Sequence, residues 1–246
     1  QVLTEHMPGV RSAAVGVWVR QGSAHETMAD AGISHMLEHM VFKGTARRTA
    51  GEIAVALEGL GGSLDAYTSR EHTSYQARVL DEHLPQAMDV LADLITGPVI
   101  AQRDLDLERE VVREEIAQVD DTPDDLIFEL HAEQLWGGHP YGRSILGTNR
   151  SVEGMTAEQL RVLHRKRYRA KSLIVAAAGH VQHDDVVERV EELFSGCSGG
   201  DTVDRIDPPQ STSSGIVHET RQSAQTHILF GTGVPGHSHP DRYPLV

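Results

Sequence analysis

The segment from His35 to His39 contains the residue types that most directly predict chemistry. It reads His-Met-Leu-Glu-His, so two imidazoles stand four residues apart and a glutamate directly precedes the second. At about 100° per residue, a helix would place His35, Glu38 and His39 on one face. Two neutral imidazoles arranged in this way can bind one zinc ion, and the glutamate can deprotonate a water molecule on the metal. The segment therefore predicts a zinc site with its own general base.

A chance match is the alternative interpretation of this motif. The chain has 15 histidines, and histidines on helix faces are often plain surface residues. The order H-x-x-E-H is, however, the inverse of the common helical motif of zinc peptidases. A catalytic zinc site usually has three protein ligands, so a third inward-facing ligand elsewhere in the chain would favour the metal.

The helix predicted for residues 102–120 offers such a ligand. Its apolar stripe consists of Leu105, Val111, Val112, Ile116 and Val119. Glu108 and Glu115 lie inside this stripe, seven residues apart and therefore on nearly the same face. Glu110 and Glu114 lie on the opposite side, where water can solvate them.

A carboxylate inside a core-facing stripe costs free energy unless it is paired or binds a metal. Glu115 is therefore predicted as the third ligand, with Glu108 near enough to support the ligands from behind. The alternative is a partly exposed helix edge that carries ordinary glutamates. The histidine motif favours the metal interpretation.

Hydrophobic periodicity predicts the elements that must position these residues. Strands are predicted for residues 13–19, 63–68, 73–80, 172–178 and 224–231. Helices are predicted for residues 33–42, 49–60, 81–95, 102–120, 123–136, 156–169 and 182–194. Thr49 and Glu52 have the spacing of a capping box at the start of the second helix. The pattern predicts an α+β or mixed α/β unit.

The composition along the chain indicates three parts. Residues 1–196 are predicted to form one domain that contains the zinc motif. Residues 197–214 are rich in Gly, Ser, Asp and Pro and predict an exposed linker. Residues 215–246 begin with the same order of strand and glycine-bearing loop as the first domain, which predicts the start of a truncated repeat.

Composition and charge exclude several classes of protein. The net charge of −14 argues against binding to nucleic acid or to an anionic membrane surface. No apolar run reaches membrane-spanning length, and no secretory signal opens the chain. Cys197 is the single cysteine, so no internal disulfide can form and a reducing compartment is expected. We therefore expect a cytoplasmic protein that binds neither nucleic acid nor membrane.

Four motifs make the chain resemble the M16 family of zinc metallopeptidases, in particular its bacterial branch similar to mitochondrial processing peptidase. They are residues 35–45, which begin with H-x-x-E-H, and residues 65–75, 108–115 and 138–143. The spacing from His39 to Glu115 also matches the family. The resemblance covers nearly the whole chain, as the family's N-terminal half with the start of its second half. It implies the processing-peptidase fold, an α+β architecture with an antiparallel-rich sheet flanked by helices.

The resemblance implies a role for each polar residue of the site. His35, His39 and Glu115 would bind one Zn²⁺ ion per chain, and Glu38 would be the catalytic general base. Glu108 corresponds to a glutamate that supports the ligands in the family. This agrees with its position in the apolar stripe.

The resemblance also implies two substrate-binding elements. One is an exposed edge strand that binds a peptide as an additional strand, and it corresponds to Gly62, Ser63, Leu64, Asp65 and Ala66. The other is the pair Asp125 and Glu129, which match positions where processing peptidases hold an arginine near the cleaved bond. Four apart on a helix, both carboxylates could reach one guanidinium. The alternative for the strand is an ordinary hairpin strand, and the alternative for Asp125 and Glu129 is a pair of solvated acidic side chains on a helix.

These implications predict a zinc-dependent metalloendopeptidase that cleaves extended peptides or precursor segments, with a preference for arginine near the bond. Family members carry a second, zinc-free half, of which only the first strand, roughly residues 216–231, is present here. A homodimer or heterodimer is therefore expected. A non-catalytic assembly subunit and a peptide-binding module are the alternative classes, and the complete ligand set argues against the first.

Overall fold

A five-stranded sheet organises the fold. The computed structural model describes residues 1–200, 205–209, 215–236 and 238–245. The strands are β1 (Val2–His6), β2 (Ser12–Val19), β3 (Ser63–Thr68), β4 (Thr73–Leu80) and β5 (Leu173–Gly179). Their order is β1-β5-β2-β4-β3, and every neighbouring pair except β1 and β5 is antiparallel. The expected α+β architecture with an antiparallel-rich sheet is confirmed.

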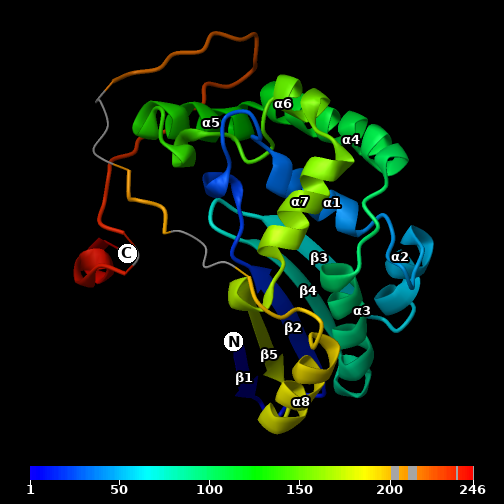
Figure 1. The fold of residues 1–246 in the computed structure, drawn as a ribbon. Coiled ribbons are helices and arrows are strands. Elements are labelled where there is room, and N and C mark those ends of the chain that lie inside the picture. The colour runs from blue at the N-terminus through cyan, green and yellow to red at the C-terminus, as the bar shows by residue number, and fades with distance from the viewer. Residues whose placement is uncertain (201–204, 210–214, 237, 246) are drawn as a thin grey trace.

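Helices pack against this sheet and form a second layer beyond it (Figure 1). The α-helices are α1 (Ile33–Val41), α2 (Ala50–Glu58), α3 (Leu84–Thr96), α4 (Gln102–Asp121), α5 (Pro123–Trp136), α6 (Asn149–Gly154), α7 (Ala157–Arg167) and α8 (His183–Leu193). Figure 1 shows α3 and α8 beside the sheet, with α4, α5 and α6 together at the top of the view. Helix α1 contacts β3, β4 and α4, so side chains from the sheet and from α4 can meet on it.

Apolar side chains at alternate strand positions build the core. On β2, Ala13, Val15, Val17 and Val19 are buried, while Ala14 is exposed. This period of two is the geometry of a strand, and it turns one face of the sheet toward the helices.

The apolar residues of α1 fix the rotation of that helix. Met36, Leu37 and Met40 have 0% of their surface exposed. His35 and His39 are only partly buried because they lie on the side of the helix that these three residues leave uncovered. The burial of the apolar face therefore decides where the two imidazoles point.

The start of α1 is held by a buried carboxylate and by two closely packed glycines. Glu26 accepts hydrogen bonds from the backbone N–H groups of Gly32 and Ser34, each at 2.8 Å, and so satisfies amides that a helix N-terminus leaves without partners. Burial raises the pKa of Glu26 to about 7. Gly32 (φ 88°) packs against Gly147, where a Cβ would approach the carbonyl oxygen of Ala31 to 2.3 Å.

Most predicted elements are present at the predicted positions. Strands β3 and β4 have the predicted bounds, and the capping box of Thr49 and Glu52 opens α2. The structure adds β1 and α6, which the sequence patterns did not predict. Strand β1 is short and largely polar, and it is held by a parallel ladder to β5, a partner about 170 residues away that local periodicity cannot reveal.

Residues 224–231 are not a strand, contrary to the prediction from the sequence. They have irregular conformation, and no described strand pairs with them. A β-prone segment becomes a strand only in a ladder with a neighbour, and this segment lacks one in the described structure. It runs instead beside α5, where His227 Nδ1 lies 2.7 Å from Asp124 Oδ1.

The predicted linker, residues 197–214, is described only in part. Its residues 201–204 and 210–214 lie outside the described residues. Cys197 is buried, and its backbone oxygen accepts a hydrogen bond from the N–H of Ala170. Cys197 is therefore packed on the domain, contrary to the prediction, whereas Ser198 and Gly199 are exposed as predicted.

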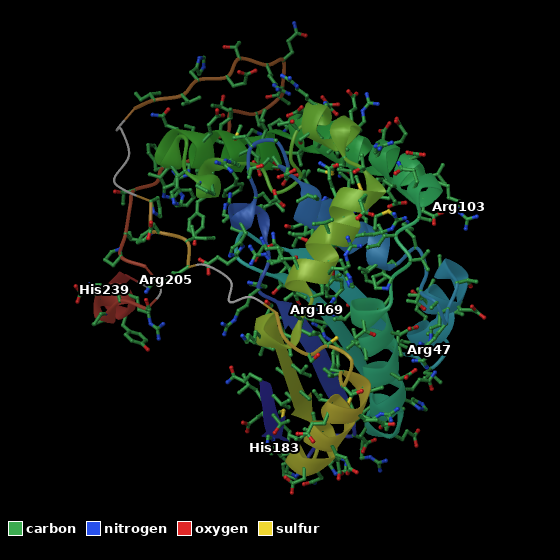
Figure 2. All side chains as sticks on the ribbon, viewed as in Figure 1. Arg47, Arg103, Arg169, His183, Arg205 and His239 are labelled. Atoms are coloured by element: carbon green, nitrogen blue, oxygen red, sulfur yellow. The ribbon has the colours of Figure 1, made fainter. Side chains whose placement is uncertain are left out.

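Charged side chains such as those of Arg47 and Arg103 project from the outside of the molecule (Figure 2). These two side chains are 56% and 87% exposed. Among the described residues, none of the helices combines the length and the apolar character that crossing a membrane requires.

Candidate metal centre

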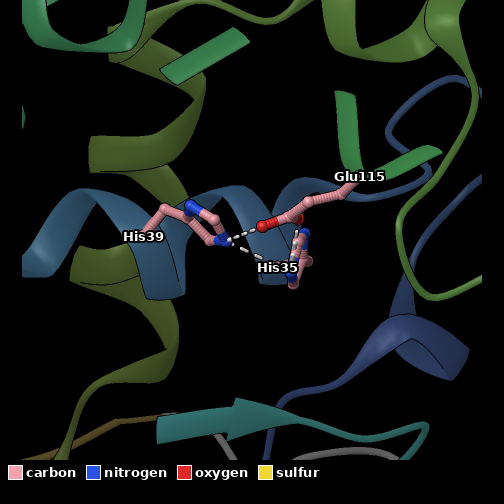
Figure 3. A group of neighbouring side chains, drawn as sticks. All are labelled: His35, His39 and Glu115. Atoms are coloured by element: carbon pink, nitrogen blue, oxygen red, sulfur yellow. Dashed lines mark hydrogen bonds and ion pairs between the residues drawn. The ribbon is translucent and has the colours of Figure 1, made fainter. Parts of the chain in front are cut away.

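Three possible metal ligands meet where α1 faces α4 (Figure 3). His35 and His39 lie one turn apart on α1, and their Nε2 atoms are 3.3 Å apart. Glu115, on α4, brings Oε2 to 3.6 Å from His35 Nε2 and Oε1 to 3.6 Å from His39 Nε2. The structure thus brings together the three residues that the sequence singled out as ligands.

This set of donors fits a zinc ion. Atoms bound at about 2.0–2.2 Å to a tetrahedral centre lie roughly 3.3–3.6 Å apart, close to the separations between the three side chains. Oε2 of Glu115 is buried and has no hydrogen-bond partner. A buried carboxylate oxygen without a donor is costly, and a cation would remove this cost. Burial and the neighbouring His39 lower the pKa of His35 to about 4, so its neutral imidazole can offer a lone pair.

Glu108 supports His39 through the other nitrogen of its ring. Its Oε2 lies 3.1 Å from His39 Nδ1, so Nδ1 donates the proton and the lone pair of Nε2 faces the other ligands. Glu108 is only 6% exposed, in agreement with its predicted place in the apolar stripe. The ammonium of Lys43 lies 2.6 Å from its second oxygen, Oε1. Val111 is 43% exposed, so the stripe is narrower than the sequence predicted.

Glu38 lies on the same side of α1, near His39 and the carboxylate of Glu115. Its Oε2 accepts a hydrogen bond from Thr68 Oγ1 at 2.5 Å. Thr68 is the last residue of β3 and is buried, so this bond joins the sheet to the helix. Burial raises the pKa of Glu38 above its usual value, and the hydrogen bond from Thr68 acts in the opposite direction.

Strand β3 is an edge strand that ends at this centre. It pairs with β4 along its whole length, and no described strand pairs with its other edge. Of residues 62–66, Asp65 is exposed and the others are half-buried. The open edge of such a strand presents N–H and C=O groups that an added extended chain can pair with.

Asp125 and Glu129 lie on α5, outside the group of metal ligands. Asp125 is exposed and Glu129 is half-buried. Burial raises the pKa of Glu129, while the nearby positive charge of Arg70 acts to lower it. Arg70 follows β3 by two residues, and its Nε donates to the carbonyl oxygen of Tyr141 at 2.8 Å. Glu129 is therefore near the end of β3 and already faces a cation of the protein itself.

Sequence reasoning did not identify Lys43 and Thr68. Lys43 lies just beyond the end of α1 and its partner Glu108 is on α4, so the pattern of one segment does not show the pair. The hydrogen bond of Thr68 to Glu38 spans 30 residues of sequence, and a hydroxyl at the end of a strand gives no local signal for such a contact.

Two family comparisons cover almost the entire chain. Residues 1–149 match the family described as insulinase (peptidase family M16), and residues 154–246 match the peptidase M16 inactive domain. Strand β5 belongs to the second match but lies between β1 and β2, which belong to the first. The two matches therefore meet within one sheet.

Similar proteins are known from bacteria and plants. An uncharacterized zinc protease of Mycobacterium leprae is 43% identical over 253 residues, which cover 100% of this chain and 56% of that protein. A probable mitochondrial-processing peptidase subunit beta of Arabidopsis thaliana is 40% identical over 203 residues, or 82% of this chain and 38% of that protein. A crystal structure of a protease from Helicobacter pylori has a TM-score of 0.78 and 26% identity, over 86% of this chain and 51% of that one. The chain spans about half the length of the curated relatives it matches.

Proposed function

The chain belongs to the insulinase family of peptidases, family M16, and on this premise we propose that it is the catalytic half of a zinc-dependent endopeptidase. The observation that carries the proposal is the convergence of His35, His39 and Glu115, with Glu38 beside them. The substrate would be an extended peptide or a precursor segment. The zinc proteases among its relatives support the choice of metal.

His35, His39 and Glu115 would hold the ion. Zinc, when bound, supplies a Lewis acid that acidifies water and polarises a peptide carbonyl. Glu108 accepts a hydrogen bond from Nδ1–H of His39, which leaves the lone pair of Nε2 free to bind the ion. The low pKa of His35 keeps that imidazole neutral near pH 7, which is the form that binds a metal.

Glu38 would move the proton during hydrolysis. Because Thr68 engages Oε2, the other oxygen, Oε1, would accept the proton of the attacking water. Burial raises the pKa of Glu38, which makes the protonated carboxyl easier to form and lets it return the proton to the leaving nitrogen. One side chain would thus serve first as base and then as acid.

The open edge of β3 would bind the substrate main chain. A peptide added there would form main-chain hydrogen bonds with residues 62–66 and would continue past Thr68. Main-chain pairing gives affinity with loose demands on sequence. Because Thr68 also contacts Glu38, a peptide on this edge would pass close to the general base.

Replacing Thr68 with valine is expected to lower kcat for peptide cleavage about tenfold and to change KM by less than about twofold. Valine has nearly the same shape but cannot donate to Glu38, and a hydrogen bond to a charged group contributes about 1.5–3 kcal/mol. Steady-state kinetics on the full-length gene product would measure this. Thr68→Ser keeps the hydroxyl and should retain most of kcat; a serine variant as slow as the valine variant would contradict the role of the hydroxyl.

Asp125 and Glu129 would favour arginine near the cleaved bond. Asp125 is the more available acid, since Glu129 already lies near the charge of Arg70. An arginine of the substrate would donate a charge-assisted hydrogen bond to Asp125 and would have to compete with Arg70 for Glu129.

Charge reversal at Asp125 tests this preference. Asp125→Lys should lower kcat/KM for peptides with arginine near the bond about tenfold relative to matched peptides without it, since one charge-assisted hydrogen bond of about 1.5 kcal/mol is lost. Asp121→Lys, an equal charge change at the exposed end of α4, is the control. An arginine preference that is the same in both variants would rule out the role of Asp125.

A further domain or a partner subunit, identical or different, would complete the substrate-binding surface, because the chain spans about half the length of its relatives.

The single cysteine supports a reducing, cytoplasmic location.

Zinc content and peptide cleavage, measured together on the full-length gene product, test the proposed function. A peptidase contains zinc and cleaves peptides. A peptide-binding module would contain zinc without cleaving, and an assembly subunit would need neither. Either of the last two results would overturn the proposal.

A further inference from the structure

Lys43 is connected to the metal centre through Glu108. Its ammonium lies 2.6 Å from Glu108 Oε1, and Glu108 Oε2 lies 3.1 Å from His39 Nδ1. The contacts form a continuous path from the lysine through the carboxylate to the imidazole. Lys43 does not itself reach any of the three metal ligands in the described structure.

Glu108 is a carboxylate in an environment that disfavours an unpaired charge. It is 6% exposed and lies in the apolar stripe of α4, between Leu105 and Val112, which are 0% exposed. An uncompensated charge in such a place is strongly destabilising. Among the described residues, the ion pairs of Glu108 are with Lys43 and with His39. His39 is neutral when it binds a metal, so Lys43 supplies the countercharge.

The balance of charges at the metal centre also indicates a role for Lys43. Three carboxylates, those of Glu38, Glu108 and Glu115, gather around two neutral imidazoles. A divalent cation balances two of these negative charges and leaves one. The ammonium of Lys43 balances the third, at the carboxylate that does not face the ion.

The backbone holds Lys43 at this position. It follows His39 by four residues, just beyond the end of α1, and its N–H donates to the carbonyl oxygen of Met40 at 3.2 Å. The next residue, Gly44, has a φ of 129° and accepts a hydrogen bond from the N–H of Val99. One short segment therefore carries both the imidazole and the ammonium that contact Glu108.

We propose that Lys43 is a positioning residue of the zinc site, which holds the Glu108 carboxylate in the orientation that fixes His39. This inference rests on the proposed function, because it assumes that His39 binds zinc. An ordinary ion pair at the protein surface, which contributes little, is the competing explanation, since the Lys43 side chain is 35% exposed. The two explanations differ in whether zinc affinity depends on Lys43 through Glu108.

The zinc dissociation constant of the full-length gene product, measured by competition with a chelating indicator, tests the inference. Lys43→Met should bind zinc about 10- to 100-fold more weakly, the usual effect of losing a group that orients a ligand. Lys43→Arg keeps the charge and should stay within about threefold of the wild type. Lys166→Met, at an exposed lysine of α7, is the matched control and should not change the affinity.

A double-mutant cycle with Glu108→Gln separates the two explanations. Glutamine is neutral and needs no countercharge, so Lys43→Met should cause little further loss of affinity in that background. Thermal unfolding of the metal-free proteins verifies that the variants fold. Lys43→Gln keeps a hydrogen-bonding group without the charge and gives the same expectation if the methionine variant does not fold.

Three results would overturn the inference. Lys43→Met could bind zinc as tightly as Lys166→Met, Lys43→Arg could be as weak as Lys43→Met, or the loss could persist in full beside Glu108→Gln. In each case the wild type still binds zinc and the proposed function stands. A wild type that binds no zinc would instead overturn the proposed function itself.

Discussion

Replacement of Glu38 with glutamine is expected to lower kcat for peptide cleavage by about 10²- to 10⁴-fold while about one zinc ion per chain is retained. The amide cannot accept a proton at Oε1 or return it to the leaving nitrogen, and a positioned general base contributes an acceleration of this size. The three proposed ligands are unchanged, so the affinity for zinc should stay close to that of the wild type. Kinetics and elemental analysis of the same preparation measure both quantities.

The matched control for this change is Glu58→Gln. Glu58 is an exposed glutamate on α2, and its amide variant should have wild-type activity and zinc content. A Glu38→Gln protein that keeps more than about a tenth of wild-type kcat with a full complement of zinc would exclude Glu38 as the base. Loss of zinc together with activity would point instead to a role in holding the metal.

The fold could be predicted where local pattern and tertiary packing agree. The alternation along β2 and the apolar face of α1 are both local, and both elements lie where the sequence predicted. Strand β1 was missed because its ladder to β5 is non-local, and the segment 224–231 was predicted wrongly because its β-prone sequence has no described partner. Strand formation depends on a neighbour, and a single segment does not specify one.

The metal centre could be predicted because its residues come in two pairs, and the spacing within each pair puts both members on one face of a helix. Four residues separate His35 from His39, and seven separate Glu108 from Glu115, so a helical wheel places each pair on one face. What the wheel could not give was the distance between the two helices, which packing of α1 on α4 decides. Lys43 was missed because its partner is on the other helix.

Removal of zinc is expected to destabilise the wild type far more than a variant that lacks Glu115. A ligand at about 1,000 times its dissociation constant stabilises the folded state by about 4 kcal/mol. For a unit of 150–250 residues this corresponds to a fall in Tm of about 8–16 °C when the metal is chelated. In Glu115→Gln the third ligand is lost, so the difference in Tm with and without zinc should shrink to a few degrees.

In the absence of zinc, Glu115→Gln should be at least as stable to unfolding as the wild type. Without zinc, Glu115 places a buried carboxylate oxygen with no donor beside two imidazoles, so the neutral glutamine should leave the metal-free protein as stable as the wild type or slightly more stable. Glu114→Gln, on the exposed side of α4, should behave as the wild type in both states. Calorimetry of the three proteins with zinc and with chelator measures this. A zinc-dependent rise in Tm that survives in Glu115→Gln would mean that the metal is held elsewhere, because a site built from His35, His39 and Glu115 cannot keep its affinity after losing its only anionic ligand.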